Sequence, residues 1–235
     1  MKINIITLGC SKNTVDSENL AGAFKAQGHT VYFDRQRNDC DAVIVNTCGF
    51  IGDAKEESIN TILEQIQVKT RGRKARRLIV CGCLVERYKE ELCKEMPEVD
   101  AWYGVHEWNK ISEECGMLNE ELVPPPHNSS FLTPHSSLAR CLSTPGHYAY
   151  LKIAEGCNRS CSYCAIPLIR GAHKSLPIDE LVAEAKALVS KGVKELLVIS
   201  QDTTWYGLDL YRRRALGELL DRLADESGAQ WIRLH

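Results

Sequence analysis

The first 120 residues alternate short apolar runs with segments of helical periodicity, and this alternation constrains the fold more than any other feature. Apolar runs of roughly four to eight residues are typical of buried strands, whereas apolar residues recurring at i, i+3, i+4 and i+7 are typical of helices. The predicted strands are 2–8, 29–33, 41–47 and 76–82, and the predicted helices are 15–28, 52–68 and 84–96. This order predicts an α/β fold with a doubly wound parallel-sheet domain of the flavodoxin or Rossmann type.

The helix predicted at 52–68 has the clearest apolar pattern. Its stripe consists of Ile59, Ile62, Leu63 and Ile66. Asp53, with Glu56 three residues later, resembles a capping box at the start of the helix. We expect the stripe to pack on the sheet.

A second domain is predicted to begin at His147, after a stretch that is rich in Pro, Ser and Thr and has no period. Its predicted elements are strand 147–156, helix 177–192, strand 195–200, helix 214–228 and the opening of a strand at 230–235. Three strands and two helices do not close an α/β sheet, so we expect the chain to be a fragment of a longer protein. The predicted organisation is a domain at 1–121, a linker at 122–146 and a truncated domain at 147–235.

Eleven cysteines in 235 residues, with no recognisable export signal, indicate that some of the thiols have a chemical role. No apolar run approaches the roughly 20 residues that cross a bilayer, and the N-terminal apolar stretch is shorter than the roughly 7–15 residues of a secretory segment. We therefore expect a cytoplasmic protein with reduced thiols, and an odd number of cysteines fits a disulfide framework badly. The formal net charge of −2 argues against a dedicated nucleic-acid binder.

Three cysteines of the first domain occupy equivalent positions. Cys10, Cys48 and Cys83 each follow a predicted strand, with a glycine beside them. Because the carboxyl ends of parallel strands lie along one edge, these thiols are expected to converge where helix starts stabilise thiolate charge. Convergence fits a metal or iron–sulfur site, and burial as small core residues is the alternative. The cysteines without this setting are expected to pack in the core: Cys40, Cys81, Cys93, Cys115 and Cys141.

The second domain carries Cys157, Cys161 and Cys164 in a C-x3-C-x2-C pattern after a predicted strand. A zinc site needs a fourth ligand, for which His147 and His173 are candidates, and zinc motifs usually come as paired C-x2-C elements. Three thiols in one loop instead suit a 4Fe–4S cluster whose fourth iron is open to a substrate or cofactor.

This loop, CNRSCSYC, resembles the signature of the radical S-adenosylmethionine (SAM) superfamily, with Tyr163 at the aromatic position. The resemblance implies that the second domain is the first part of a partial (β/α) barrel, and that the open iron binds SAM and cleaves it to a 5′-deoxyadenosyl radical. It also places Tyr163 near the SAM adenine, although an aromatic residue here can simply pack the loop. Gln201 and Asp202 end the predicted strand 195–200 on the same edge, where they can contact SAM or only cap a helix and order the loop.

Together the two cysteine sets resemble the methylthiotransferases, a family of radical SAM enzymes, over nearly the whole chain. The resembling segments are LGCSKNTVDSEN, NTCGFIGDAKEES, GCLVERY and HYAYLKIAEGCNRSCSYCAIPLIRG. They imply two 4Fe–4S clusters, one of them held by Cys10, Cys48 and Cys83, and two molecules of SAM used for each product. CSKN, the last of these segments and ELLVISQDTTWYG resemble the RimO-type branch, which adds a methylthio group to the β-carbon of an aspartate in a small-subunit ribosomal protein.

The resemblance also implies partners. They are the ribosomal protein or the ribosome as substrate and an electron donor such as flavodoxin or ferredoxin, with no membrane. The family's remaining barrel strands and its TRAM domain are expected to lie beyond this sequence, so this part alone is expected to be inactive. Leu176 stands where the family usually has an arginine, which leaves any role of that arginine in doubt.

Two other functions remain open on the sequence alone. One is methylthiolation of an adenosine in tRNA, which would use the same chemistry on a different substrate. The basic run at 69–77 is compatible with docking to RNA, or with an exposed connection between two elements. A zinc-stabilised binding module would have no catalysis, and its metal content would distinguish it.

Overall fold

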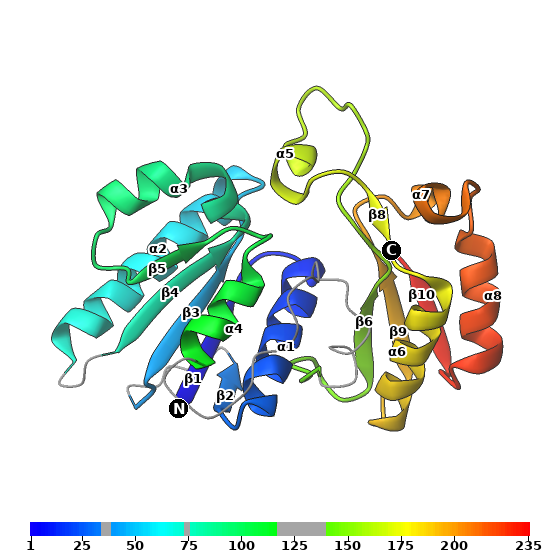
Figure 1. The fold of residues 1–235 in the computed structure, drawn as a ribbon, viewed down its shortest axis with the longest axis horizontal. Helices are drawn as coiled ribbons and strands as arrows, with labels where there is room; N and C mark the ends of the chain where they lie inside the picture. The colour runs from blue at the N-terminus through cyan, green and yellow to red at the C-terminus, as the bar shows by residue number, and fades with distance from the viewer. Residues whose placement is uncertain (34–38, 73–75, 117–139) are drawn as a thin grey trace. The chain divides into compact units, whose positions relative to one another are not determined.

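The computed structural model describes residues 1–33, 39–72, 76–116 and 140–235, which form two compact units. Unit 1 comprises the ranges up to residue 116 together with Arg140 and Cys141, and unit 2 comprises Leu142–His235 (Figure 1). Most of the linker predicted at 122–146 lies outside the described residues, so the domain boundaries stay a prediction. Within the described residues, no helix is long and apolar enough to cross a membrane.

Unit 1 is built on a parallel sheet whose described strands follow the order β2-β1-β3-β4-β5. Its elements are β1 (Lys2–Thr7), α1 (Ser11–Ala26), β2 (Thr30–Phe33), β3 (Ala42–Thr47), α2 (Gly52–Arg71), β4 (Arg77–Gly82), α3 (Cys83–Glu95), β5 (Ala101–Tyr103) and α4 (Trp108–Gly116). The chain leaves β1 toward β2 on one side and continues at β3 on the other, so a topological switch point lies between β1 and β3. This confirms the predicted doubly wound, flavodoxin-like class.

The strands of unit 1 direct alternate side chains into two apolar cores. On one face, Ile44 packs with Phe24 of α1 in a cluster that also includes α4. On the other face, Val43 packs with Ile62 of α2 and Leu84 of α3. All five side chains are at most 2% exposed, and burial of each stabilises the fold by roughly 1.5–3 kcal/mol.

The helices of unit 1 differ in part from the prediction. Ile62 of α2 is fully buried, whereas Ile59 and Leu63 are 36% and 42% exposed, because α3 packs on the same face and leaves α2 a narrow line of contact. The predicted capping box is wrong: the N-cap of α2 is Ile51, and no side chain caps the helix. α1 begins at Ser11 rather than at residue 15. The elements β5 and α4 are too short to show a periodic apolar pattern, so the sequence did not predict them.

A buried ion pair joins α1 to the segment that follows residue 139. Arg140 Nε donates to Glu18 Oε2 at 2.8 Å, and Arg140 Nη2 donates to the same oxygen. Both side chains are buried, and these two charge-assisted hydrogen bonds offset part of the cost of desolvation. Arg140 is thereby held on unit 1.

Unit 2 contains a parallel sheet in the order β10-β9-β6 and a short antiparallel pair, β7 and β8. Its elements are β6 (Tyr148–Lys152), β7 (Ala154–Glu155), α5 (Ile166–Arg170), β8 (Lys174–Ser175), α6 (Ile178–Ser190), β9 (Glu195–Ile199), the 3-10 helix η2 (Thr203–Trp205), α7 (Leu208–Tyr211), α8 (Leu216–Glu226) and β10 (Trp231–Leu234). The strand predicted at 147–156 is therefore two strands, separated at Ile153.

The helices of unit 2 pack on one face of its sheet. Leu151 of β6 and Val198 of β9 share a core with Leu181 of α6 and Leu219 of α8. Parallel strands in sequential order, with their helices on one face, are how a (β/α) barrel begins. The structure thus supports the predicted opening of a partial barrel.

Candidate functional site

The first set of thiols lies along the carboxyl edge of the unit 1 sheet. Cys10 is the N-cap of α1 after β1, Cys48 directly follows β3, and Cys83 is the first residue of α3 after β4. Because β1, β3 and β4 are neighbours in the sheet, the three cysteines end three adjacent strands. Cys10 and Cys48 flank the switch point, the position where doubly wound sheets bind ligands.

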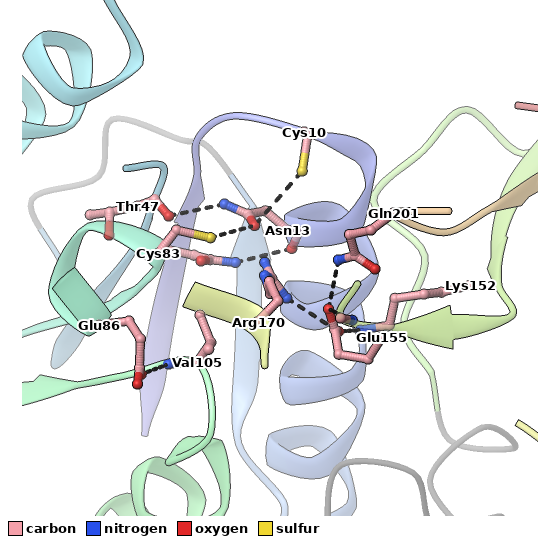
Figure 2. A network of polar contacts seen from close by, with 12 residues as sticks. Cys10, Asn13, Thr47, Cys83, Glu86, Val105, Lys152, Glu155, Arg170 and Gln201 are labelled. Atoms are coloured by element: carbon pink, nitrogen blue, oxygen red, sulfur yellow. Dashed lines mark hydrogen bonds and ion pairs between the residues drawn. The ribbon is translucent and has the colours of Figure 1, made fainter. Parts of the chain in front are cut away.

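Asn13, on the first turn of α1, lies between two of these thiols (Figure 2). Its Oδ1 is 4.0 Å from Cys10 Sγ and 3.8 Å from Cys83 Sγ. Its Nδ2 donates to the carbonyl oxygens of Leu8 and Thr47, at 2.8 and 3.0 Å. A single buried amide therefore contacts the ends of β1, β3 and β4.

Cys48 approaches the loop of Cys10 through Gly9. A Cβ atom at Gly9 would lie 2.5 Å from Cys48 Cβ and 2.9 Å from Cys48 Sγ, and Gly9 has a φ of +90°. Only glycine meets both requirements without strain. A Cβ at Gly49 would likewise lie 2.7 Å from Leu84 Cα, beside Cys83, so the three cysteine loops pack directly on one another.

Ser58 of α2 fixes the backbone of Cys48. The Cys48 N–H donates to Ser58 Oγ at 3.0 Å, and the Ser58 hydroxyl lies 2.8 Å from the carbonyl oxygen of Ala54. Ser58 is fully buried, so its hydroxyl satisfies a loop N–H that has no place in a strand ladder. Neither Asn13 nor Ser58 was singled out in the sequence. Asn13 had one available signal, its place three residues after Cys10 at a helix start.

Cys81, the close neighbour of Cys83, lies in a different environment. It is fully buried in the core, and its thiol lies 3.6 Å from the carbonyl oxygen of Val45. Burial raises the pKa of the Cys81 thiol well above its usual value, and Asp16 and Cys83 raise it further. A thiol held protonated is a poor metal ligand, which favours Cys83 over Cys81.

The remaining cysteines of unit 1 divide by burial. Cys40 and Cys115 are buried, as predicted, and Cys141 is partly buried against the core. The prediction is wrong for Cys93, which is exposed on α3. The position next to it, Leu92, faces the core instead.

The second set of thiols shares one loop of unit 2. Cys157 is buried, Cys164 is half-buried and Cys161 is exposed. The Cys157 N–H donates to the Gly171 carbonyl oxygen at 3.1 Å, which joins the two ends of the loop. The Arg159 N–H points at Cys157 Sγ, 3.4 Å away, an arrangement that stabilises negative charge on sulfur.

Gly156 permits this loop to close. Its φ is +74°, and a Cβ there would overlap the carbonyl oxygen of Ala172 and lie 2.5 Å from that of Gly171. The residue before the first cysteine of the loop must therefore be glycine.

Glu155 connects the segments on either side of the loop (Figure 2). Its Oε2 accepts from Lys152 Nζ at 2.8 Å and from Arg170 Nη1 at 3.3 Å, and its Oε1 accepts from Gln201 Nε2 at 2.7 Å. Burial alone would raise the pKa of Glu155, but the charges of Lys152 and Arg170 outweigh it and lower the pKa to about 2. The sequence interpretation missed Glu155 and Arg170, although they directly flank the cysteine loop.

Arg159 fastens the middle of the loop to the turn after β9. Its Nε donates to Asp202 Oδ2 at 2.6 Å, Nη2 donates to Thr204 Oγ1 at 3.1 Å, and the guanidinium lies 5.1 Å from the centroid of the Trp205 ring. The bond to Asp202 raises the pKa of Arg159, and Cys157 and Cys161 act in the same direction. A permanent positive charge therefore lies beside two of the three sulfurs.

The residues predicted to contact SAM are placed in three different ways. Asp202 caps η2 through the Thr204 N–H at 3.0 Å, the structural role that the sequence left as an alternative. Gln201 binds Glu155, and its buried Oε1 has no hydrogen-bond partner among the described residues. Tyr163 is 89% exposed, so its ring does not pack the loop.

The other sequence candidates lie apart from the thiols. His147 precedes β6, at the strand end opposite the loop, and His173 Nε2 lies 3.2 Å from Ser175 Oγ. Leu176 is partly buried against the core of unit 2. In the basic run at 69–77, Lys69 pairs with Asp100 and Arg76 is buried against Gln65, while 73–75 lie outside the described residues.

The thiols of each set are brought near one another rather than set around a common centre. Across the described residues, no group of three or more His, Cys, Asp or Glu side chains is arranged to hold a metal ion. The donor sets nevertheless suit a thiolate-bound cluster: each has three cysteines, and each includes a backbone or side-chain amide directed at the sulfur-bearing loop.

Comparison with known proteins defines the class first. Residues 2–104 match the family described as "Uncharacterized protein family UPF0004", and residues 151–234 match the radical SAM superfamily. Among solved structures, the chain is similar to the radical SAM methyltransferase TsrM from Kitasatospora setae, solved with cobalamin and a 4Fe–4S cluster, with a TM-score of 0.58 and 13% identity over 94% of this chain and 50% of that one. It is also similar to the cobalamin-dependent radical SAM enzyme OxsB, with a TM-score of 0.56 and 10% identity over 96% of this chain and 36% of that one. These two structures show the fold alone.

Curated relatives then narrow the similarity. The chain is 52% identical to the ribosomal protein uS12 methylthiotransferase RimO of Parabacteroides distasonis, over 100% of this chain and 51% of that protein. It is 48% identical to the RimO protein of Symbiobacterium thermophilum, over 100% of this chain and 48% of that protein. Over its whole length the chain is similar to proteins named as methylthiotransferases, and its second unit matches the radical SAM superfamily, as the sequence resemblance predicted. It spans about half the length of the curated relatives that it matches.

Proposed function

We propose that this protein is a methylthiotransferase that adds a methylthio group to the β-carbon of an aspartate in ribosomal protein uS12. Relatives named as ribosomal protein uS12 methylthiotransferases match the chain over its whole length. The observation that carries the proposal is the presence of two separate sets of three thiols, one in each unit, each with polar groups that order it. Two sets match a reaction that needs a radical source and a sulfur donor.

In unit 2, Cys157, Cys161 and Cys164 would hold the radical SAM cluster. Such a cluster supplies the electron that cleaves SAM and starts hydrogen abstraction from an unactivated carbon. Arg159 would offset the charge of the thiolates, and Glu155 would keep the two ends of their loop together. Both residues act by ordering the loop.

SAM would bind beside this loop. The buried Gln201 Oε1 offers an acceptor for an N–H donor such as the SAM amino group. The exposed Tyr163 ring offers an apolar face for the adenine. Asp202 would contribute indirectly, since its carboxylate is engaged with Arg159 and Thr204.

In unit 1, Cys10, Cys48 and Cys83 would hold a second 4Fe–4S cluster that carries the sulfur to be transferred. The three ends of adjacent strands provide one thiol each, and the packed glycines keep the loops close. The substrate would be uS12 in the ribosome, the electron donor a flavodoxin or ferredoxin, and the compartment the cytoplasm. The domain division would follow the predicted boundaries.

The test is an anaerobic reaction of the intact protein with SAM, a reductant and uS12. We expect brown protein that contains iron and sulfide, and a uS12 aspartate that gains one methylthio group in place of one hydrogen, located by peptide mass spectrometry. Methylthiolated adenosine in tRNA with unmodified uS12 would redirect the proposal to tRNA. Colourless protein with zinc and no iron would overturn it.

A further inference from the structure

We propose that Asn13 is the positioning residue that gathers the three cysteine loops of unit 1 before any cluster is bound. The proposal deepens the proposed function, because it concerns how the Cys10, Cys48 and Cys83 site forms. Its basis is the set of contacts that one buried amide makes with three chain segments that are far apart in sequence.

The amide nitrogen of Asn13 joins the loops that follow β1 and β3. It donates to the carbonyl oxygen of Leu8, two residues before Cys10, at 2.8 Å, and to that of Thr47, the residue before Cys48, at 3.0 Å. An amide nitrogen has two N–H donors, and two carbonyl oxygens receive them. These carbonyls lie at strand ends, where the sheet ladder ends.

The amide oxygen of Asn13 faces two of the thiols. Cys83 Sγ lies 3.8 Å and Cys10 Sγ lies 4.0 Å from Oδ1. An amide oxygen has two lone pairs and can accept from both thiols. Two sulfurs that share one small acceptor are held close to each other, although Cys10 and Cys83 belong to strands that are not direct neighbours.

The position of Asn13 is itself fixed by its neighbours. Its backbone carbonyl accepts from Asn46 Nδ2 at 3.0 Å, and the same Asn46 nitrogen lies 2.9 Å from Ser17 Oγ, which in turn bonds Thr7 Oγ1 at 2.9 Å. Asn13, Ser17 and Asn46 are all fully buried. A side chain held in this way has little rotamer freedom, so it can hold the thiols at defined positions.

The consequence is that Asn13 acts on cluster binding by holding the loops: the bonds from its Nδ2 to Leu8 and Thr47 persist when the thiols lose their protons to bind metal. Partners of metal ligands typically change metal affinity by about 10- to 100-fold when they are lost. Replacement of Asn13 by Ala should therefore weaken thiolate metal binding in unit 1 far more than an equal substitution of an exposed asparagine. Asn60 of α2 is exposed and serves as that matched control.

The test uses the intact protein with Cys157, Cys161 and Cys164 changed to Ala, so that unit 1 alone supplies the cysteine set. Anaerobic titration with Co²⁺, followed by its thiolate charge-transfer absorption, measures the affinity of this background, of Asn13→Ala and of Asn60→Ala. We expect about 10- to 100-fold weaker binding for Asn13→Ala and no comparable change for Asn60→Ala. Equal binding by all three proteins would overturn the role of Asn13 and leave the proposed function intact. A background protein that binds neither Co²⁺ nor iron through thiolates would instead overturn the unit 1 cluster, and the inference with it.

A second measurement uses the background protein with its native Asn13, so it remains possible if Asn13→Ala fails to fold. In the metal-free background protein, phenylarsine oxide should bridge Cys10 and Cys83, a product that peptide mass spectrometry locates. Modification of the two thiols without a bridge would show that they are not gathered in advance, and would overturn the proposal. Asn13→Asp, which keeps the shape and loses both donors, should bridge less than the background does.

Discussion

Unit 2 holds its three thiols in one loop of consecutive residues, whereas unit 1 holds its three on separate loops that end three adjacent strands. The loop of unit 2 closes through local contacts, such as the Cys157 N–H on the Gly171 carbonyl oxygen. The site of unit 1 exists only once β1, β3 and β4 have paired. Loss of a few local contacts can therefore disturb the unit 2 site, while the unit 1 site depends on the whole sheet.

The two sites also differ in the charge of the residue that orders them. Asn13 in unit 1 is a neutral amide, and Glu155 in unit 2 is a carboxylate between two cations. A neutral group keeps its hydrogen bonds at any pH, whereas a carboxylate loses its charge in acid. Glu155 should therefore make the unit 2 site sensitive to acid. Asn13 does not titrate, so it should give the unit 1 site no such sensitivity.

The largest expected difference is in SAM cleavage. Cys161→Ala should abolish reductive formation of 5′-deoxyadenosine, because it removes one of the three cluster ligands proposed in the loop. Cys83→Ala should lower the iron content by about one cluster and leave SAM cleavage largely intact. The measurements are iron analysis and chromatography of the nucleoside.

Cys81→Ala is the matched control, since Cys81 is two residues from Cys83 but buried in the core. It should leave the iron content unchanged. Loss of SAM cleavage in Cys83→Ala, with the unit 2 cluster still assembled, would contradict the separate roles proposed for the two sets, namely SAM cleavage in unit 2 and sulfur transfer in unit 1.

The next largest effect is expected on stability, when the charge of Glu155 is removed. Glu155→Gln leaves Lys152 and Arg170 buried side by side without their anion, which typically costs about 3–5 kcal/mol. Urea unfolding at neutral pH measures the change in the free energy of unfolding. Asp225→Asn, at an exposed carboxylate of the same unit, should change it little.

The same carboxylate predicts a pH dependence. The folded-state pKa of Glu155 is lowered from 4.5 to about 2, so its stabilisation is present above the higher value and is lost as the pH falls through the lower one. The free energy of unfolding of unit 2 should fall by about 3 kcal/mol across this range, and Glu155→Gln should lack this part of the decline. Equal acid sensitivity in both proteins would show that other groups cause it.

A smaller effect is expected from Gly156→Ala. The left-handed backbone costs about 1–2 kcal/mol for any residue with a Cβ, and the overlap with the carbonyl oxygens of Gly171 and Ala172 adds to it. Gly192 has a φ of +100°, but a Cβ added there would meet no atom within 4 Å, so Gly192→Ala measures the backbone cost alone. The midpoint of thermal unfolding should be lower for Gly156→Ala than for Gly192→Ala. The reverse order would mean that the loop has room to relax.

The smallest expected effect is that of Arg159→Lys on stability. The Arg159 side chain is half exposed, so water screens its ion pair with Asp202 and the pair contributes little to stability. Lysine keeps the charge but cannot reach Asp202 and Thr204 together, so the loop should become more mobile. We expect Cys157 to react faster with a thiol reagent, while the free energy of unfolding stays nearly unchanged. An unchanged reaction rate would show that the Arg159 guanidinium does not order the loop.

Much of the fold was predictable because it depends on local periodicity. The apolar runs that became β1, β3 and β9, and the segment that became α6, carry their period within a few residues. The errors fall where burial depends on distant neighbours. Ile59 and Leu63 of α2 have the right spacing but are exposed, because α3 takes the adjacent space on the sheet.

The sequence by itself predicted the two sets of cysteines, since spacing in one loop and equivalent positions after strands are both properties of the linear chain. Only the tertiary structure decided how they are ordered. Asn13 and Glu155 contact groups up to 70 and 46 residues away, and no local pattern encodes such a contact. The physical reason is that a buried polar side chain must find its partners wherever the folded chain brings them.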